Sequence, residues 1–338
     1  VVGPGESRMN LAVVIRATAG LCKVVKRHAT GTPTLVVGCD ARYGSSEFAT
    51  AACRVASAAG VRVLALPQAN PTPLTSFSML HFDADAGVMV TASHNPAPDN
   101  GYKVYLGGTV AQGDGRGVQI VPPFDAEIAA AIEAAPPADE VPMNDDLIEA
   151  VDPRGEYVAC ASALASGEAS AREDLRIVLT AMHGVGAAIT SRVLAEAGFA
   201  NVSLVAAQAQ PDPDFPTVPF PNPEEAGALD MAMEQAREQG ADLIIAVDPD
   251  ADRCALAVPD PGAEAGWSPL SGDQIGCLLG EFLAARGLEG SLANSIVSSR
   301  LLARIAEAHG LVHHTTLTGF KWIARAPKLA FGYEEAIG

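Results

Sequence analysis

The sequence predicts an α/β protein made of serial α/β domains of similar build. One observation is a repeated order of elements: an apolar segment, an amphipathic helix, a glycine and a second apolar segment follow one another three times along the chain. Another is that each connection holds one helix and little else, which is typical of parallel βαβ units. With 338 residues, the chain is also too long for one ordinary hydrophobic core. We therefore expect two or three domains.

The first unit follows a long N-terminal helix, which we expect over residues 8–28 with Ser7 as its N-cap. The unit itself is predicted as a strand over 34–39, a helix over 46–59 and a strand over 61–66. Two strands joined by one short helical connection are expected to lie parallel in the same sheet.

Two further units repeat this order. We predict strand, helix and strand over 175–179, 187–197 and 202–205 in the second unit, and over 295–298, 299–308 and 311–315 in the third. Proline-containing breaks at 134–144 and 258–267 separate the units. The expected domains are therefore 1–152, 153–262 and 263–338.

Composition argues against several classes of partner. The net charge of −18 disfavours nucleic acids and anionic membranes, because both need a basic surface. No apolar run approaches the roughly 18 residues of a membrane span. The six cysteines are widely spaced in apolar surroundings, so we expect reduced thiols that serve as small core residues. Reduced thiols favour a cytoplasmic protein, which we expect to be a monomer or a homodimer.

A buried strand that ends in a stiff polar loop is predicted around Ser93. The apolar run 86–90 ends at the sequence TASHNP, and a second β-like stretch follows at 102–106. His94 stands beside Ser93, but neighbouring side chains in extended backbone point to opposite faces, so a Ser–His dyad is not expected. Taken alone, Ser93 fits turn chemistry better than catalysis, because serine and asparagine are common turn residues.

Three acidic side chains follow another apolar segment, at residues 243–247. Asp248, Asp250 and Asp252 alternate, and alternate side chains of extended chain share one face. Converging carboxylates raise one another's pKa unless a cation is bound, and oxygen ligands of this kind suit Mg²⁺. Arg253 adds a planar donor group for a phosphate or a carboxylate. The alternative is a solvated acidic turn, whereas an EF-hand fits poorly because Arg253 stands where that loop needs glycine.

Six short motifs carry a resemblance to a known enzyme family. They are TASHNP (91–96), FPNPE (220–224), DPDADR (248–253), SGDQIG (271–276), TGFKW (318–322) and GYEEAIG (332–338). Through them the whole chain resembles the α-D-phosphohexomutase family, which includes phosphoglucomutases and phosphomannomutases. The segments SRMN, TAMHGVG and TLTGFKWIA are similar to the branch that mixes phosphomannomutases with phosphopentomutases.

The resemblance implies four domains around a central cleft, three of which are three-layer α/β/α domains of similar build. We expect those three here. The family's G-T-A-G-x-R-G motif would precede Val1, and the fourth domain, which binds the non-reacting phosphate, would follow Gly338. Both are expected to be absent, so these 338 residues alone are predicted to turn over slowly.

The resemblance also implies a phosphoserine mechanism. Ser93 would carry a phosphoryl group, donate it to a sugar monophosphate and regain phosphate from the resulting hexose 1,6-bisphosphate, which is the intermediate and the activator. One Mg²⁺ would be held by a phosphoserine oxygen of Ser93 together with Asp248, Asp250 and Asp252.

Further side chains are assigned to the phosphate and the sugar by the same resemblance. Arg253 matches an arginine that contacts the transferring phosphate, and His94 and Lys103 are candidates for proton transfer or phosphate contact. Glu334 matches the glutamate that accepts hydrogen bonds from sugar hydroxyls. Ala336 stands where glucose-preferring relatives have serine, which leaves the sugar open. A second substrate loop is matched by Thr318, Gly319 and Lys321.

We therefore predict a Mg²⁺-dependent isomerase that interconverts the 1- and 6-phosphates of a hexose, with a small phosphosugar as its partner. A phosphopentomutase is the close alternative. A haloacid-dehalogenase-type phosphatase, with an aspartate nucleophile and an incidental Ser93, fits less well because Ala251 stands where that fold has Thr or Val. A sugar-phosphate-binding module with Ser93 unphosphorylated is the third hypothesis.

Three other features receive structural interpretations. Glu335 is expected to be solvated. The segment 183–186, HGVG, is interpreted as a turn rather than an anion site. Residues 211–225 are too apolar for a linker and are predicted to form a packed irregular loop, for which no chemical role follows.

Overall fold

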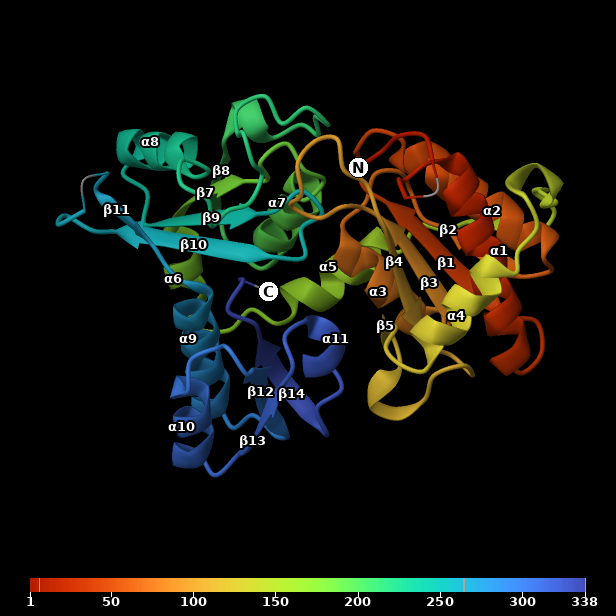
Figure 1. Ribbon diagram of the computed structural model, residues 1–338. Coiled ribbons are helices and arrows are strands. Elements are labelled where there is room, and N and C mark those ends of the chain that lie inside the picture. Colours follow the sequence, from red (N-terminus) through yellow and green to blue (C-terminus); the bar gives the residue numbers. More distant parts are fainter. Residues whose placement is uncertain (6, 264, 338) are drawn as a thin grey trace.

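Three β-sheets with packed helices follow one another along the chain (Figure 1). The structure is a computed structural model that describes residues 1–5, 7–263 and 265–337. In Figure 1 the first sheet lies on the right, the second at the upper left and the third below the second. The predicted serial α/β architecture is confirmed.

The first sheet has six strands in the order β5-β4-β3-β1-β2-β6. Its strands are β1 (Thr34–Cys39), β2 (Arg62–Ala65), β3 (Ala86–Val90), β4 (Tyr102–Leu106), β5 (Val118–Gln119) and β6 (Ile148–Ala150). Its helices are α1 (Leu11–His28), α2 (Ser45–Ala58), α3 (Thr72–His81) and α4 (Phe124–Glu133), with short 3₁₀ turns η1 (Gly113–Gly115) and η2 (Ala138–Glu140). β1 pairs in parallel with β2 and β3, whereas β4 pairs antiparallel with β3 and β5. The first predicted βαβ unit is therefore confirmed, with α2 as its connection.

Helix α1 begins later than predicted. Its N-cap is Asn10, whose Oδ1 accepts a hydrogen bond from the Val13 amide at 3.0 Å, so Ser7 as the cap is wrong. The backbone at Asn10 is extended, and its side-chain amide donates to the carbonyls of Gly3 and Gly5 in the segment before it. Asparagine and serine are both good caps, and these tertiary contacts decide between them.

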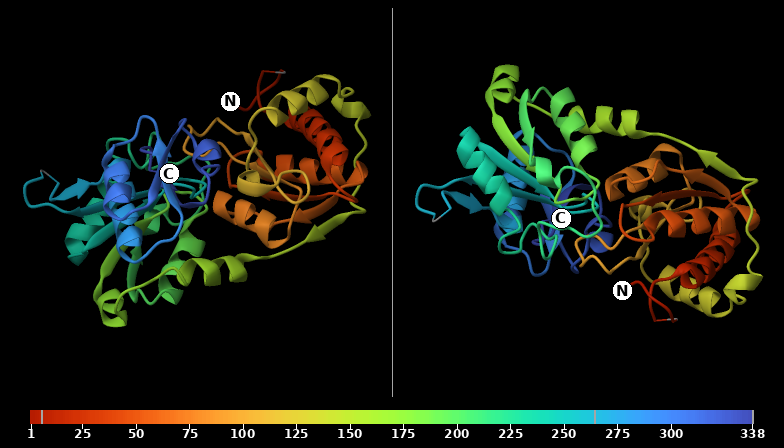
Figure 2. Two further views of the ribbon diagram at one scale, coloured as in Figure 1. Left: turned by 90° about the horizontal axis from the view of Figure 1, so that it is seen from below. Right: turned by 90° about the horizontal axis from the view of Figure 1, so that it is seen from above.

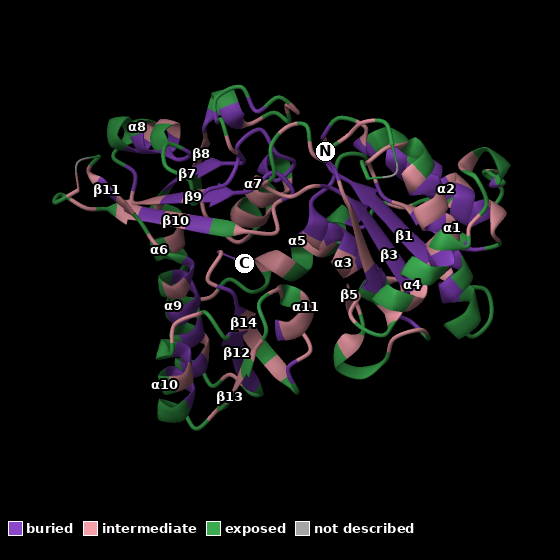
Figure 3. Cartoon of the chain, viewed as in Figure 1, coloured by how far each residue is buried: buried purple, intermediate pink, exposed green. Residues whose placement is uncertain are grey.

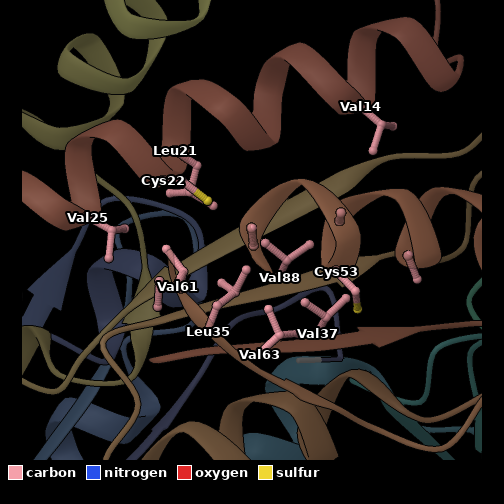
Figure 4. Close-up of a cluster of buried hydrophobic side chains, with 14 of the residues drawn as sticks. Val14, Leu21, Cys22, Val25, Leu35, Val37, Cys53, Val61, Val63 and Val88 are labelled. Carbon is pink, nitrogen blue, oxygen red and sulfur yellow. The ribbon is translucent and has the colours of Figure 1, made fainter. Parts of the chain in front are cut away.

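The core of the first sheet lies between its strands and the helices α1 and α2. Figure 4 shows Leu21 and Val25 of α1 directed toward Leu35 and Val63 of the strands. All four side chains are buried. Burying one such side chain contributes about 1.5–3 kcal/mol, which fixes the strands against the helices.

The second sheet has five strands in the order β11-β10-β9-β7-β8. Its strands are β7 (Arg176–Thr180), β8 (Asn201–Leu204), β9 (Leu243–Val247), β10 (Cys254–Pro259) and β11 (Trp267–Pro269). The helices of this part are α5 (Arg154–Ser162), α6 (Ala169–Asp174), α7 (Ala187–Glu196) and α8 (Asp230–Gln239), with η3 (Ala206–Gln208). β7 lies between β8 and β9 and is parallel to both, which confirms the second predicted unit.

The third sheet has three parallel strands in the order β13-β12-β14. Its elements are α9 (Gly272–Ala285), β12 (Ser291–Ser295), α10 (Leu301–Ala308), β13 (Val312–Thr316), α11 (Phe320–Ile323) and β14 (Leu329–Tyr333). The strand predicted over 295–298 is wrong in position, because the sheet uses the polar-looking segment SLANS instead. Ser291 and Asn294 are buried there because their side chains donate to the carbonyls of Pro327 and Ser299.

The first two sheets meet at the loops that follow their middle strands. The loop between β3 and β4 extends toward α7 in Figure 1, and it is directed toward the second sheet in the two views of Figure 2 as well. Figure 3 shows the strands behind this loop, β1 and β3, as buried. The backbone amide of Thr72 donates to the carbonyl of Asp250 at 2.9 Å, which joins α3 to the loop after β9. Ligand sites of open α/β sheets lie at such strand ends.

Two sequence-based expectations about composition can be compared with the structure. Four cysteines are buried as predicted, but Cys160 and Cys254 are exposed, so their assignment to the core is wrong. No helix in the described part of the chain is both long and apolar enough to cross a membrane.

Candidate active site

Ser93 lies half-buried in the loop after β3, which we call the serine loop (residues 91–101). Its backbone is left-handed, with φ of 51°, a conformation that costs an L-residue about 1–2 kcal/mol. The Oγ of Ser93 donates to Oδ2 of Asp248 at 3.0 Å and lies 3.3 Å from Nδ1 of His94. The prediction that the side chains of Ser93 and His94 point to opposite faces is therefore wrong. It assumed extended backbone, whereas the left-handed conformation of Ser93 bends the chain and brings the two side chains together.

The predicted acidic cluster is present in the loop after β9, which we call the aspartate loop (residues 248–253). Ligand oxygens of Asp248, Asp250 and Asp252 all lie within 4.8 Å of one another. They converge through a turn rather than through strand alternation, since the amide of Ala251 donates to the carbonyl of Asp248 at 2.9 Å and Ala251 has a φ of 53°. Asp248 and Asp250 are fully buried.

Lys103 is the internal cation of this cluster. Its Nζ lies 2.7 Å from Oδ2 of Asp250 and 2.7 Å from Oδ2 of Asp252. Thr72 Oγ1 also donates to Oδ2 of Asp250, at 2.5 Å. Strand β4, which carries Lys103, and helix α3, which carries Thr72, thus bind the aspartate loop from the first sheet.

The charges of the cluster are only partly balanced. Burial, with the repulsion of Asp250, raises the pKa of Asp248 well above its ordinary value. Burial alone would raise the pKa of Asp250 too, but Lys103 and Thr72 hold it below its usual range. The Oδ1 atom of Asp250 is buried without a hydrogen-bond donor from the described residues. The three carboxylates, one of which has this orphan oxygen, carry more negative charge than Lys103 offsets and form a set of oxygen ligands that fits Mg²⁺.

A cavity of about 740 Å³ connects this cluster with the third sheet. Among the residues predicted for the site, those that line it are Ser93, His94, Lys103, Asp252, Arg253, Gly319, Lys321 and Glu334. Thr318 is exposed and is not among the lining residues. The cavity therefore brings groups from all three sheets to one space, which is large enough for a small ligand.

Glu334 is the buried acid on the third-sheet side of the cavity. Its side chain is 8% exposed, and its Oε2 atom has no hydrogen-bond partner within the described part of the chain. Burial raises the pKa of Glu334, and the nearby Arg253 opposes that rise. A buried carboxylate oxygen without a donor is a natural acceptor for ligand hydroxyl groups.

Arg253 joins the second sheet to the third. Its backbone amide donates to Oδ1 of Asp248 at 3.0 Å, and its Nη1 donates to the carbonyl of Ala336 at 3.2 Å. The expectation that Glu335 is solvated is wrong, because its Oε2 accepts hydrogen bonds from Ser295 Oγ at 2.6 Å and Ser298 Oγ at 2.9 Å. The last residue of the GYEEAIG motif, Gly338, lies outside the described residues.

The HGVG segment packs against the aspartate loop, in agreement with its interpretation as a turn. A Cβ atom on Gly184 would lie 2.3 Å from Cα of Pro249, so only glycine allows this approach. The His183 ring contacts Thr217 Oγ1 at 2.8 Å.

Sequence reasoning missed Arg42, Thr72 and the aromatic residues of the 211–225 loop. Arg42 is buried and donates a hydrogen bond to the Ser93 carbonyl of the serine loop. The ring centroid of Phe220 lies 6.1 Å from that of His94. One signal was available, because Asp40 and Arg42 follow β1 at the same edge of the sheet as the serine loop. Charged residues at that edge are candidates for a site.

Comparison with known proteins identifies the family. The family models for phosphoglucomutase/phosphomannomutase, alpha/beta/alpha domains I, II and III, match residues 1–138, 155–262 and 271–338. A probable phosphomannomutase from Haemophilus influenzae is 46% identical over 98% of this chain and 67% of its own length. A phosphoribomutase from Saccharomyces cerevisiae is 36% identical over 99% of this chain, and a human phosphopentomutase 33% identical over 100% of it; each is covered over 59% of its length.

A solved structure supports the same assignment. The crystal structure of a putative phosphomannomutase from Thermus thermophilus superposes with a TM-score of 0.79 at 26% identity, covering 98% of this chain and 71% of that one. The chain spans about three fifths to two thirds of the length of the three sequence relatives. The chain belongs to the phosphoglucomutase/phosphomannomutase family.

Proposed function

We propose that this chain carries the phosphoryl-transfer centre of a Mg²⁺-dependent phosphosugar mutase that works through phosphorylated Ser93. The observation that carries the proposal is the 3.0 Å contact between Ser93 Oγ and Asp248 Oδ2. It joins a hydroxyl on the first sheet to three clustered carboxylates on the second, at the wall of a cavity that reaches Glu334. In the first transfer of this scheme Ser93 needs no base, because as phosphoserine it is the leaving group.

The proposed reaction has two half-reactions. In the first, a sugar hydroxyl oxygen forms a bond to the phosphorus of phosphoserine while the P–Oγ bond breaks. The hydroxyl proton is transferred to a base, and the released Oγ of Ser93 takes up a proton. In the second, Oγ of Ser93 attacks the other phosphate of the sugar bisphosphate and gives up its proton to a base. The bond from that phosphorus to the sugar oxygen breaks, and the released sugar oxygen takes up a proton. The net change moves a phosphate between two hydroxyls of one sugar.

His94 and Lys103 differ in the proton chemistry that they offer. Burial, aided by the charge of Arg253, lowers the pKa of His94 to about 4, so the imidazole is neutral at pH 7 but a weaker base than a free histidine. Its Nδ1 lies 3.3 Å from Ser93 Oγ, which is the geometry that supports a role in proton transfer. Burial opposes the charge of Lys103, but Asp250 and Asp252 raise its pKa, so it stays a cation. We assign His94 as the proton acceptor and Lys103 to charge stabilisation.

Asp248, Asp250, Asp252 and the oxygens on Ser93 would hold the metal ion. When bound, Mg²⁺ supplies positive charge that stabilises the phosphoryl oxygens during transfer. Arg253 lines the cavity next to these residues, and its planar guanidinium suits a phosphate.

The sugar is assigned to the third-sheet side of the cavity. Glu334 would accept hydrogen bonds from its hydroxyls, with Gly319 and Lys321 beside it and Thr318 at the exposed start of the same loop. A hexose phosphate is our first choice, as in the Haemophilus influenzae relative's name. A pentose phosphate is the second candidate, because Ala336 offers no hydroxyl and two relatives are named phosphoribomutase and phosphopentomutase.

Phosphosite mapping after incubation with a hexose 1,6-bisphosphate and Mg²⁺ tests this proposal. We expect acid-stable phosphate on Ser93, abolished in Ser93→Ala and retained in Ser46→Ala, a change at an exposed serine outside the cavity. Assays with mannose, glucose and ribose phosphates then rank the sugars.

Borohydride trapping in parallel distinguishes the other hypotheses. An acyl phosphate on Asp248 or Asp250 would replace the mutase by a phosphatase mechanism. Absence of phosphate from the wild-type protein, combined with tight binding of a sugar phosphate, would favour a binding module.

A further inference from the structure

Arg42 contacts the serine loop more extensively than any feature of the sequence suggested. Its Nη2 donates to the carbonyls of Ser93 and Asn95, both at 2.6 Å. Its Nη1 donates to the carbonyls of Pro96 at 3.0 Å and Asp99 at 3.3 Å. One guanidinium therefore binds four carbonyl groups spread over seven residues of the loop.

The guanidinium is itself fixed on its other sides. Its Nε lies 3.4 Å from Oδ2 of Asp40, and Asp40 is held by Ser45 Oγ at 2.5 Å and by the Arg42 amide at 3.0 Å. The ring of Phe215 covers one face, with its centroid 4.9 Å from Cζ of Arg42. Arg42 is only 4% exposed, so water does not compete for these bonds.

The serine loop needs such a donor. Ser93 is in the left-handed conformation, and the prolines at 96 and 98 have no amide hydrogen to offer neighbouring carbonyls. The Pro96 carbonyl also accepts from the Asp99 amide at 2.9 Å, but without Arg42 the carbonyls of the other three residues would have to find new donors. Relaxation of Ser93 toward a common conformation would then move Oγ. Arg42 is not among the residues that line the cavity, so its hydrogen bonds reach the site through the loop. Its charge also interacts with Asp248 and Asp250, and Arg42→Lys keeps that charge.

Phe215 brings the second sheet into this arrangement. It belongs to the loop at residues 211–225, to which sequence analysis assigned no chemical role. Phe215 packs in a buried cluster with Met182 and Val218, and Ala97 of the serine loop lies against that cluster. Phe220 of the same loop lies edge-on to His94. The 211–225 loop thus contacts Arg42 and two residues of the serine loop.

We propose that Arg42, covered by Phe215, is a positioning residue that holds Ser93 in line with the aspartate loop. Its role in turnover rests on the proposed phosphoryl transfer, whereas its role in ordering the loop does not. Displacements near 1 Å at a reacting atom cost roughly 100-fold in rate, so loss of the four bonds is expected to lower kcat far more than KM.

The test uses Arg42→Lys and Phe215→Leu, with Arg62→Lys as the matched control. Arg62 lies on β2 of the same sheet and forms an exposed ion pair with Glu149. Lysine keeps the charge of Arg42 but lacks the planar set of donors. We expect Arg42→Lys to lower kcat roughly 100-fold with KM changed less than about threefold, and Phe215→Leu to lower kcat roughly 5-fold. Millimolar guanidinium should restore part of the rate in Arg42→Ala.

Amide hydrogen exchange of the metal-free proteins provides a readout independent of activity. Exchange over residues 91–101 should be roughly 10-fold faster in Arg42→Lys than in wild type, with β1 and β3 unchanged and with Arg62→Lys like wild type. Wild-type exchange in this segment for both Arg42→Lys and Phe215→Leu would overturn the proposal, whatever the rates. If the wild-type protein never phosphorylates Ser93 but the variants still exchange faster, the ordering role stands and the proposed function fails.

Should Arg42→Lys fail to fold, the Phe215→Leu variant carries the same test. It keeps an apolar side chain in the cluster and removes only the ring over the guanidinium. Unchanged exchange and unchanged kcat in that variant would contradict the part assigned to Phe215.

Discussion

The serine loop and the aspartate loop occupy equivalent places in two sheets but are stabilised in opposite ways. Each follows a strand that pairs in parallel with its neighbour, β3 in the first sheet and β9 in the second. The serine loop is built from neutral carbonyls that share one buried cation, Arg42. The aspartate loop is built from three carboxylates that share Lys103 and leave one buried oxygen without a donor from the described chain.

This difference explains which of the two loops has its polar groups paired by the protein alone. The four carbonyls of the serine loop are matched by one protein donor group, so its geometry is fixed by the fold alone. The carboxylates of the aspartate loop outnumber Lys103, so a further bound cation would offset their remaining negative charge. The same strand-end position thus carries a hydroxyl held by the fold on one side and, on the other, a carboxylate cluster for which we propose a metal ion.

Among substitutions that test the difference between the two loops, Asp250→Asn is expected to have the largest effect. The change removes the carboxylate that both Thr72 and Lys103 contact. Mg²⁺ affinity, measured by isothermal titration calorimetry, should fall roughly 100-fold, because a charged oxygen ligand becomes a neutral one. The control is Asp83→Asn, since Asp83 pairs with Arg116 at an exposed site. Wild-type affinity in Asp250→Asn would mean that the cluster is not the metal site.

Lys103→Met should make the aspartate loop depend on added metal. Without Nζ, three carboxylates repel one another, and the metal-free protein should lose roughly 3 kcal/mol of unfolding free energy. Saturating Mg²⁺ should then raise the thermal midpoint more in the variant than in wild type. Lys23→Met, at an exposed lysine of α1, controls for the loss of charge. Equal Mg²⁺ shifts in Lys103→Met and wild type would contradict the view that Lys103 compensates the cluster.

Glu334→Gln should weaken the sugar end of the site by a smaller amount. A hydrogen bond to a charged acceptor is worth about 1.5–3 kcal/mol, so kcat/KM should fall roughly 10- to 100-fold. Glu335→Gln is the paired control, because Ser295 and Ser298 already occupy its Oε2 and it does not line the main cavity. Steady-state assays that found the larger loss in Glu335→Gln would reverse the assignment of the two glutamates.

The smallest effect on activity is expected from Asn10→Ala. Removing the N-cap of α1 should cost about 1 kcal/mol of stability in urea unfolding, with kcat unchanged, because Asn10 does not line the cavity. Ser7→Ala should cost nothing measurable by the same method. A larger loss of stability in Ser7→Ala than in Asn10→Ala would show that Ser7 is the N-cap of α1.

The sequence predicted the parts of the site that depend on local pattern. Apolar runs that end abruptly in polar residues placed both loops at strand ends, and the strands 86–90 and 102–106 match β3 and β4 residue for residue. The acid cluster was predicted as well, although a turn at Ala251 rather than strand alternation brings it together. Periodicity reports which segments are buried and cannot report a left-handed residue inside a turn.

The parts that were missed depend on contacts between distant segments. Glu335 looked solvated because its two serine partners lie some forty residues away in the sequence. The strand β12 was predicted a few residues too late in the sequence, because its polar residues did not look buried. In the folded chain its buried serine and asparagine donate hydrogen bonds to carbonyl groups from other segments. Arg42 was overlooked for the same reason, since its four acceptors lie more than fifty residues away.

The most direct test of a single transfer centre shared by the two loops is a single-turnover measurement. Wild-type protein and Asp250→Asn, each phosphorylated on Ser93, would be mixed with a sugar monophosphate and saturating Mg²⁺, and the loss of phosphate from Ser93 followed by rapid quench. We expect transfer from the wild-type protein to the sugar and a rate at least roughly 1000-fold lower in Asp250→Asn. Equal rates in the two proteins would show that Ser93 acts without the aspartate loop and would contradict the account.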